Sequence, residues 1–597
     1  MARTVGIGIQ DFSKLREGGY FYVDKTSFIK EWWENGDDAT LITRPRRFGK
    51  TINMSMIEQF FSMEYAGRKD LFEGLSIWGE EKYRQLQGTY PVISLSFAGI
   101  KENTFEVTKL KIYDLLRNLY SDYDFLLESD ALSINDKKFM NRVLGDMGDA
   151  EATMAIHYLS KFLQRYYHKR VIILLDEYDT PMQEAYVHGF WEDLVDFTRS
   201  LFNSTFKTNP WMERGIMTGI TRVSKDAPSS LGSKKPRQVS EVGFPTRLGS
   251  TSPSSQFQSI FSDLNNLEVV TTTSDKYATA FGFTEEEVFS GLDECGLSEE
   301  KEQVKCWYDG FIFGTQKDMY NPWSILNFLD KKKYLIYWAN TSSNRLVGKL
   351  IQEGSTEIKE KFADLLSGEV IRCPIDEQIV YNQLDDDQDA IWSLLLASGY
   401  LKVLAKENEN EVGEERVLYD LVLTNFEVKK MFKGMVSSWF TKSKTEYNAF
   451  LKAMLKKDKK AMNAYMNRIT LSIFSYFDTG NHPSGAEPER FYHGFVLGLL
   501  VDMQKDYVIT SNRESGFGRY DVMLEPKNPA KDVGIIIEFK VYDEEDEEEL
   551  KDTAMEALKQ IETMKYSTIL EEKGVPADRI YRYGFAFQGK KVLIEIG

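Results

Sequence analysis

The sequence predicts a multidomain α/β protein, and three observations support this fold class. The chain has 597 residues, several times the length that one hydrophobic core serves. Its N-terminal part alternates strand-like apolar runs with helical stretches, which is typical of a parallel sheet covered by helices. Its C-terminal part carries two strand-like runs with carboxylates, at residues 519–526 and 534–542. We therefore expect a parallel sheet, a mainly helical middle and a C-terminal α/β domain.

Composition limits the classes of protein to which the chain can belong. The formal net charge of -18 argues against a protein that coats nucleic acid by bulk charge, although it allows a local basic groove. No apolar run approaches the roughly 20 residues of a membrane span, and the first residues lack the apolar core of a signal peptide. The only cysteines are Cys295, Cys306 and Cys373, an odd number that fits a reducing compartment. We expect a cytoplasmic protein with no membrane partner.

The first motif is TRPRRFGKT, residues 43–51, which lies between a strand-like run, ATLIT, and a helix-like stretch at residues 52–63. Gly49, Lys50 and Thr51 match the end of the phosphate-binding pattern G-x-x-x-x-G-K-[ST], whereas Arg44 occupies its first glycine position. In such a loop the main-chain N–H groups and the helix end bind phosphate, the lysine lies near the outer phosphates and the threonine holds Mg²⁺.

The basic residues inside this loop are further candidates for nucleotide binding. Arg46 and Arg47 can contact phosphate through their guanidinium groups. Arg44 and Pro45 make the entry to the loop stiffer and bulkier than glycine would. The alternative is a basic turn followed by an ordinary amphipathic helix.

A second motif, RVIILLDEYDTP at residues 170–181, strengthens the nucleotide hypothesis. Its apolar run predicts a buried parallel strand with Asp176 and Glu177 at the carboxyl end, which is a Walker B pattern. Asp176 would hold Mg²⁺ and Glu177 would polarise the attacking water. The alternative is a core strand whose acidic end is solvated. With strand-like runs at 92–97 and 215–220 and helical stretches at 105–128 and 150–168, we predict a P-loop ATPase domain.

The segment after residues 215–220 is less informative. Thr218, Thr221 or Arg222 is a candidate sensor beside the terminal phosphate, but capping or a turn is an equally good interpretation. Residues 226–258 are rich in Ser, Pro and Gly, and we predict a flexible insertion there.

The middle of the chain changes character twice. Residues 283–380 read as mainly helical, and we assign their aromatic clusters, CWYDGFIFG and YNPWSILNFL, to a core. Residues 391–425 read as a helix followed by a hairpin, which suggests a winged-helix-like element, although its acidic tip would repel a nucleic-acid phosphate. The predicted domains are therefore 1–282, 283–390, 391–478 and 479–597.

The C-terminal domain carries the most specific group of candidate catalytic residues. Asp521 lies on one strand-like run, and Glu538 and Lys540 share one face of the next because side chains alternate along a strand. If the two strands pair, both carboxylates can bind a divalent cation, with the Phe539 carbonyl as a further ligand and Lys540 facing the same site. Such a site suits phosphodiester hydrolysis. The alternative is a surface ladder of ion pairs.

Flanking helices offer supporting residues for this site. Residues 489–500 form an amphipathic pattern in which Glu489 and His493 lie one turn apart, and Glu489 is the candidate third carboxylate. Residues 553–567 predict a helix that offers Gln560, Lys565 and Tyr566 to the same cleft.

As a set, these motifs resemble a bacterial family that joins a predicted AAA-ATPase-like domain to a C-terminal nuclease-like domain of the PD-(D/E)XK superfamily. The resemblance runs through YFYVDKTSFI, TRPRRFGKT, LLDEYDTP, TGITR, LNNLEV, WYDGFIFG, YNPWSILNFL, YWANTSSN, SLLLASGYL, FYHGFVLGLL and IIIEFK. It implies that an arginine is expected at position 44, and that the C-terminal domain has a restriction-endonuclease-like fold. The chain departs from the family in the long segment 226–258, which puts the sensor assignment in doubt.

The same resemblance implies roles for the residues singled out above. The implied nucleotide and Mg²⁺ site contains Lys50, Thr51, Asp176 and Glu177. The implied nuclease site contains Asp521, Glu538 and Lys540, with Glu489 and Gln560 in support.

The resulting hypothesis is a nuclease whose cleavage of nucleic acid, expected to be DNA, is regulated by an ATPase. Its cofactors would be ATP and Mg²⁺, with Mn²⁺ as an alternative ion at the nuclease site, and by analogy its setting would be defence against foreign DNA. The alternatives are a nucleotide-switched module that binds a protein partner and a DNA-binding regulator. A homo-oligomer, an arginine supplied by a neighbouring subunit and the choice between DNA and RNA all stay open.

Overall fold

The fold is described from a computed structural model. The described residues are 3–207, 209–221, 224–225, 258–259, 264–338, 344–376, 384, 387, 389–411, 414–439, 444–473, 496, 500, 503, 506–515, 518–542, 549–588 and 591–597. The chain divides into two compact units. The first unit comprises Met1–Thr341 and Arg372–Glu427, and the second comprises Ser342–Ile371 and Val428–Gly597. Each unit has its own sheet and core, and the four finer domain ranges stay a prediction.

The first unit is built on a parallel five-stranded sheet in the order β2-β3-β4-β1-β7. The strands are β1 (Ala39–Thr43), β2 (Val92–Ser96), β3 (Val171–Asp176), β4 (Met212–Gly219) and β7 (Leu267–Val270). Every residue of β1 and β3 is buried, as expected for strands that are covered on both faces. The predicted parallel sheet is therefore confirmed.

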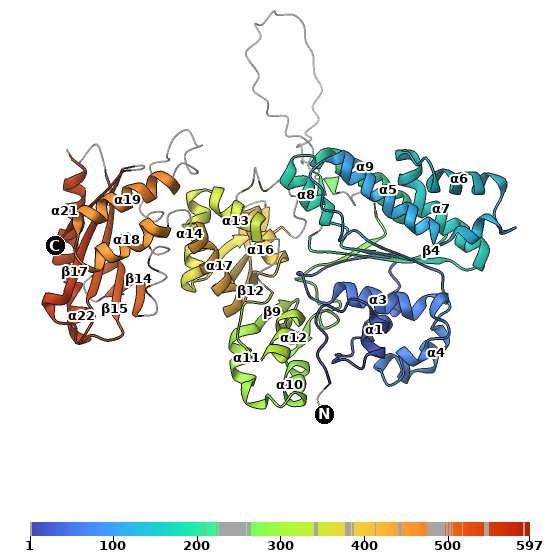
Figure 1. The fold of residues 1–597 in the computed structure, drawn as a ribbon, viewed down its shortest axis with the longest axis horizontal. Helices are drawn as coiled ribbons and strands as arrows, with labels where there is room; N and C mark the ends of the chain where they lie inside the picture. Colours follow the sequence, from blue (N-terminus) through green and yellow to red (C-terminus); the bar gives the residue numbers. More distant parts are fainter. Residues whose placement is uncertain are drawn as a thin grey trace, which may run out of the picture. The chain divides into compact units, whose positions relative to one another are not determined.

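Helices cover both faces of this sheet (Figure 1). One face carries α1 (Phe12–Glu17), α3 (Lys50–Phe61) and α4 (Glu81–Leu86), and the other carries α5 (Phe105–Ser121), α6 (Ile134–Leu144), α7 (Asp149–Tyr167) and α9 (Trp191–Phe202). Helices α2 (Ser27–Asn35) and α8 (Thr180–His188) complete the layer structure. Helix α3 buries Met54, Ile57 and Phe60 in a cluster that includes Ile42 of β1 and Leu174 of β3, which fixes the turn between β1 and α3.

The predicted flexible insertion lies almost wholly outside the described residues. Its described borders form two short strands, β5 (Ser224–Lys225) and β6 (Gln258–Ser259), which pair antiparallel.

The middle of the first unit contains helices α10 (Glu285–Glu294), α11 (Lys301–Tyr308) and α12 (Pro322–Lys331). It also contains a small sheet that the sequence did not indicate, formed by β8 (Phe283–Thr284), β9 (Asp309–Phe313) and β10 (Gln316–Tyr320) in the order β8-β10-β9. The aromatic motifs fill the core here, since Trp307, Tyr308, Tyr320 and Phe328 belong to one buried cluster. The assignment of these aromatics to a core is confirmed.

A helix followed by a hairpin stands where the winged-helix-like element was predicted. Helix α16 (Ala390–Ala397) precedes β12 (Leu401–Glu411) and β13 (Glu414–Leu423), and β11 (Ile371–Pro374) adds a third strand in the order β11-β13-β12.

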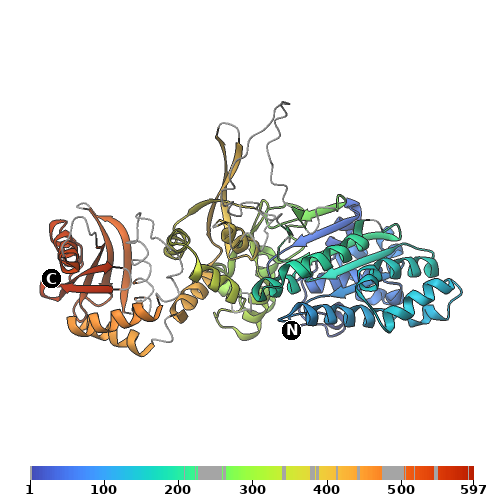
Figure 2. The ribbon, with the colours of Figure 1, turned by 90° about the horizontal axis from the view of Figure 1, so that it is seen from above.

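The second unit packs helices on both faces of a mixed sheet in the order β14-β15-β16-β17-β18 (Figure 2). The strands are β14 (Tyr507–Ser515), β15 (Gly518–Pro526), β16 (Gly534–Val541), β17 (Ile580–Gln588) and β18 (Lys591–Ile596). Only the pair β16–β17 is parallel, and α21 (Leu550–Thr563) and α22 (Ser567–Glu572) lie between these two strands in the chain. The unit's other helices are α13 (Asn344–Glu353), α14 (Thr356–Ser367), most of α17 (Phe426–Trp439), α18 (Lys444–Leu455) and α19 (Lys459–Ile473).

The two faces of this sheet have separate cores. Phe450 of α18 and Met466 of α19 pack with Ile537 on one face, whereas Ile561 of α21 packs with Ile536 on the other. Among the helices that the structure describes, none is both long enough and apolar enough to cross a membrane.

A group of three carboxylates in the first unit makes stability depend on pH. Glu285, Asp309 and Asp318 have carboxylate oxygens within 4.8 Å of one another, and Lys305 forms ion pairs with Glu285 and Asp318. Burial, followed by the nearby charge of Asp318, raises the pKa of Asp309 to about 7. Because the folded chain binds this proton more tightly than the unfolded chain, the contribution is full at low pH and declines as pH rises from about 4 to about 7.

Replacing this carboxyl with an amide should therefore stabilise the protein more at high pH than at low pH. We expect Asp309→Asn to raise the melting temperature by about 2–4 °C at pH 8 and by less at pH 5, as measured by calorimetry. Asp130→Asn, a change at an exposed aspartate, is the control and should have no pH-dependent effect. An equal shift at both pH values would contradict the assignment.

Candidate functional sites

The loop between β1 and α3 has the backbone turn of a phosphate-binding loop. Gly49 immediately precedes α3 with a φ of 84°, and Arg47 has a φ of 66°. The left-handed conformation carries no steric cost for glycine but strains an arginine, so that the loop needs support from its surroundings.

Arg44 turns away from this loop and into the protein. Its side chain is fully buried, and its guanidinium group donates hydrogen bonds to the main-chain carbonyls of Thr43, Thr271 and Lys276. The guanidinium carbon lies 4.6 Å from the centre of the Phe313 ring. Burial lowers the pKa of Arg44 to about 9. The arginine at the first glycine position thus ties the end of β1 to the segment after β7.

The main chain of the loop is held by residues from the middle of the chain. The Arg46 carbonyl accepts hydrogen bonds from Asn321 Nδ2 at 3.2 Å and from Trp338 Nε1 at 2.8 Å. Gly399 lies so close to Pro45 that a β-carbon at position 399 would stand 2.7 Å from the proline ring. These contacts explain why the loop keeps its shape with a single glycine.

Aromatic contacts hold the loop's side chains. The guanidinium carbon of Arg47 lies 3.9 Å from the centre of the Trp323 ring, which offsets the strain at this residue. The Phe48 ring packs edge-on against Phe311 at 4.7 Å and Phe313 at 5.3 Å. None of these partners was a predicted site residue, although all lie in the aromatic motifs noted in the sequence.

Lys50 is enclosed by the loop. Its ammonium group donates to the carbonyls of Arg44 at 2.8 Å and Pro45 at 2.9 Å, and only 4% of the residue is exposed. Burial lowers the pKa of Lys50, whereas the charges of Glu177, Asp179 and Asp176 raise it. The lysine therefore stands where a phosphate-binding loop requires a positive charge.

The two predicted Mg²⁺ ligands of the N-terminal site are in contact. Thr51 donates from Oγ1 to Oδ2 of Asp176 at 2.7 Å, and Thr218 donates to the other carboxylate oxygen. Burial raises the pKa of Asp176, and both hydroxyl bonds oppose that rise. Hydroxyl and carboxylate oxygens are ligands that suit Mg²⁺, so these residues fit the ion.

Glu177 follows Asp176 in a left-handed conformation, with a φ of 50°. Its main-chain N–H donates to Thr218 Oγ1 at 3.3 Å, and its Oε2 accepts from Thr180 at 3.2 Å. Of the three candidate sensors, Thr218 lies at this site, whereas Arg222 lies outside the described residues.

A series of hydrogen-bonded polar residues, which the sequence did not predict, follows the Walker B strand β3. Asp179 is buried, and its Oδ2 accepts hydrogen bonds from the main-chain N–H groups of Ile220 at 2.8 Å and Thr221 at 3.1 Å. Gln183 donates to the same oxygen at 3.4 Å and accepts from Arg46 at 2.7 Å. The signal in the sequence was the second aspartate of DEYD.

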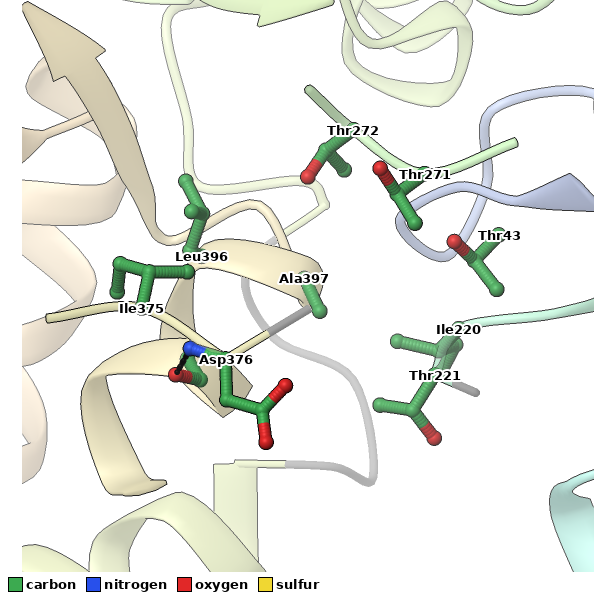
Figure 3. A pocket seen from close by; sticks show the side chains of 10 residues that line it. Thr43, Ile220, Thr221, Thr271, Thr272, Ile375, Asp376, Leu396 and Ala397 are labelled. Atoms are coloured by element: carbon green, nitrogen blue, oxygen red, sulfur yellow. Dashed lines mark hydrogen bonds between the residues drawn. The ribbon is translucent and has the colours of Figure 1, made fainter. Parts of the chain in front are cut away.

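A small cavity opens at the carboxyl edge of the sheet (Figure 3). It is lined by Thr43, Ile220, Thr221, Thr271, Thr272, Ile375, Asp376, Ser393, Leu396 and Ala397. The Asp376 main-chain N–H donates to Ser393 Oγ at 3.0 Å on its wall. Its free space of about 20 Å³ is close to that of one water molecule, so it does not locate a nucleotide base.

In the second unit, β15 and β16 pair as the sequence predicted and bring Asp521 opposite Glu538. The antiparallel register aligns Val522 with Ile537, and Asp521 and Glu538 are the next residues on the two strands. The Asp521 main-chain N–H lies 3.4 Å from Glu538 Oε2, and Asp521 Oδ2 accepts from the Phe539 N–H at 2.8 Å. The two carboxylates therefore lie close together at the end of the strand pair.

Gln560 of α21 and two neighbouring residues add polar groups to this site. Gln560 donates from Nε2 to Glu538 Oε1, and Lys540 lies two residues beyond Glu538 on the same face of β16. Tyr566 is 1% exposed, and burial raises the pKa of its phenol, as do the charges of Glu538 and Asp521. Glu489 lies outside the described residues.

The carboxylates of this second site also fit a divalent cation. Glu538 is 2% exposed, and a buried carboxylate beside another carboxylate is costly without a positive charge nearby. An all-oxygen set of donors suits Mg²⁺ or Mn²⁺ rather than zinc.

Comparisons with known families match both ends of the chain. Residues 6–227 match the family described as predicted AAA-ATPase, and residues 487–596 match the PD-(D/E)XK nuclease superfamily. The family models thus show an N-terminal predicted AAA-ATPase-like domain and a C-terminal domain of the PD-(D/E)XK nuclease superfamily. This confirms the resemblance seen in the motifs.

One curated protein is similar to this chain over about half of its own length. The chain is 26% identical over 355 residues to a protein from Azotobacter chroococcum mcd 1 described as "Uncharacterized protein in vnfD 5'region". The match covers 59% of this chain and 56% of the relative, so that the chain spans about half the length of that protein.

The position of Arg44 leads to a test of its structural role. We expect Arg44→Ala to lower the free energy of unfolding by about 2–4 kcal/mol, because it leaves a cavity and three carbonyls without their donor. Urea denaturation followed by tryptophan fluorescence measures the change. Arg44→Lys keeps the positive charge but lacks the planar guanidinium, and it should lower the free energy of unfolding by less.

The control for this test is Arg117→Ala on α5, which removes a half-exposed arginine paired with Asp114 and should stay within about 0.5 kcal/mol of the wild type. Equal stability of the Arg44→Ala and Arg117→Ala proteins would show that the buried guanidinium is not a structural tie.

Proposed function

We propose that the protein binds and hydrolyses ATP and cleaves nucleic acid in a Mg²⁺-dependent reaction, and that the nucleotide state regulates the cleavage. One observation supports this proposal: the chain has two separate groups of residues that suit phosphate chemistry. One is the enclosed Lys50 with the Thr51–Asp176 pair, and the other is Asp521 facing the buried Glu538.

At the ATP site, each residue has a chemical role. Lys50 and the loop N–H groups bind the outer phosphates, with Arg46 and Arg47 adding guanidinium contacts. Thr51 and Asp176 would hold Mg²⁺, which neutralises phosphate charge when bound. Glu177 orients the attacking water and takes up its proton.

At the nuclease site, Asp521 and Glu538 would hold the metal ion, which activates water and offsets phosphate charge when bound. Lys540 and Gln560 orient the nucleophile and the carboxylates, and Glu489 is the proposed third carboxylate. A water oxygen forms a bond to phosphorus while the bond from phosphorus to the leaving sugar oxygen breaks with its electron pair. The substrate we favour is DNA, in a cytoplasmic defence against foreign DNA.

A second function, a nucleotide-switched module that binds a partner, has its own support. The loop's main chain is bonded to Asn321 and Trp338, so a change in the loop is transmitted to the middle of the first unit even without nuclease turnover. A DNA-binding regulator is less favoured, because the described ends of the hairpin carry Glu407, Glu409, Glu411, Glu414 and Glu415.

Labelled DNA and RNA, single- and double-stranded, test the main proposal. We expect Asp521→Ala to abolish cleavage in Mg²⁺ or Mn²⁺ and to leave ATP binding unchanged, because the two sites use different residues. Lys50→Ala should abolish ATP binding and alter the cleavage rate.

The matched controls for this assay are Asp578→Ala and Lys111→Ala, which change exposed residues of the same types in the same two units. Cleavage that persists in Asp521→Ala would refute the nuclease site. No cleavage of any substrate, together with Lys50-dependent ATP binding, would favour the switched module.

A further inference from the structure

The side chain of Arg46 reaches from the phosphate-binding loop to helix α8. Its guanidinium Nη2 donates to Gln183 Oε1 at 2.7 Å. Helix α8 begins at Thr180, four residues after Asp176, so Arg46 spans the space between the loop and the Walker B end of β3. In P-loop enzymes the terminal phosphate of the nucleotide lies between these two elements.

Gln183 is held in the orientation that this contact needs. Its amide nitrogen donates to Asp179 Oδ2 at 3.4 Å, which leaves the amide oxygen facing Arg46. Asp179 is in turn fixed by the main-chain N–H groups of Ile220 and Thr221 at the end of β4. The Arg46 side chain is thus positioned by a chain of hydrogen bonds that ends in the central sheet.

The loop brings three cations together in the sequence. Arg46, Arg47 and Lys50 lie within five residues of one another between β1 and the start of α3. Like charges repel, and a phosphate group that contacts them offsets this repulsion. A guanidinium has five N–H donors, so that a bond to Gln183 is compatible with bonds to phosphate.

We propose that Arg46 is an arginine supplied in cis that contacts the terminal phosphate of ATP during hydrolysis, with Gln183 as its positioning residue. This inference rests on the proposed ATPase function. It makes the site complete within one chain, without an arginine from a neighbouring copy.

The reaction defines what the arginine does. A water oxygen forms a bond to the terminal phosphorus, and the bond from that phosphorus to the ADP oxygen breaks with its electron pair left on ADP. The water proton passes to Glu177 and then to solvent. Negative charge shifts toward the ADP oxygen and the equatorial phosphate oxygens, and the Arg46 guanidinium stabilises that charge.

The side chain of Arg46 can be changed without removing the loop's support. The bonds from Asn321 and Trp338 end on the main-chain carbonyl of Arg46, not on its guanidinium. A loss caused by Arg46→Ala or Arg46→Lys is therefore separable from a collapse of the loop, and an unchanged Kd for ADP verifies this in each variant.

The first test compares binding of ADP alone with binding of ADP and aluminium fluoride, a mimic of the transferring phosphate, by calorimetry. We expect the wild type to bind the mimic at least about 100-fold more tightly than ADP, and Arg46→Ala to lose this preference. The kcat for ATP should fall by a similar factor. Gln183→Ala should lower kcat about 10-fold at unchanged KM. Gln183→Glu keeps an acceptor for Arg46 but loses the donor to Asp179, so its kcat should lie between those of the wild type and Gln183→Ala.

The second test asks whether the arginine acts within its own chain. Lys50→Ala and Arg46→Ala proteins are mixed in equal amounts, and ATPase activity per chain is measured over a wide range of wild-type concentration. We expect no recovery of activity on mixing and no dependence on concentration.

Recovery on mixing would place the arginine in trans and overturn the inference. An Arg46→Ala protein with wild-type kcat and wild-type preference for the mimic would also overturn it, while the ATPase proposal would stand. A wild type that neither binds ADP nor hydrolyses ATP would instead refute the proposed function itself.

Discussion

The shape of the loop between β1 and α3 is the constraint on which the first unit depends. A loop with one glycine and a left-handed arginine cannot hold a phosphate-binding conformation by backbone preference alone. Arg44 anchors the start of the loop. Trp323 contacts the side chain of Arg47, and Trp338 donates a hydrogen bond to the main-chain carbonyl of Arg46. The middle of the unit therefore contributes directly to the shape of the proposed nucleotide site.

Both candidate sites contain charged groups that are buried, and this burial makes them suited to binding phosphate or metal. Lys50 and Asp176 are almost fully buried at the first site, as Glu538 is at the second, and each is surrounded by polar partners instead of bulk water. In such surroundings a charge interacts more strongly with phosphate or metal than it would at the surface. The same burial keeps Lys50 and Asp176 sensitive to one another, since each changes the pKa of the other.

A buried glutamate connects the loop's supports to a long helix. Glu427 accepts hydrogen bonds from the main-chain N–H groups of Tyr337 and Trp338 and from the Ser324 hydroxyl. Trp338 bonds to the loop, and Glu427 lies in the first turn of α17. This chain of contacts gives the proposed regulation a physical path within the first unit.

The sequence by itself predicted β1 to β4, β15, β16 and the loop motif, because these follow from local periodicity and spacing. It predicted that Asp521 meets Glu538 only on the condition that β15 and β16 pair. Only the tertiary structure decided three further features. These are the direction of the Arg44 side chain, the support of the loop by Asn321 and Trp338, and the hydrogen bond from Arg46 to Gln183. The physical reason is distance along the chain, since the two bonds to the Arg46 carbonyl join residues 275 and 292 positions apart. The small sheet around β9 was missed for a related reason, because its short aromatic strands carry no periodicity that distinguishes them from a helix.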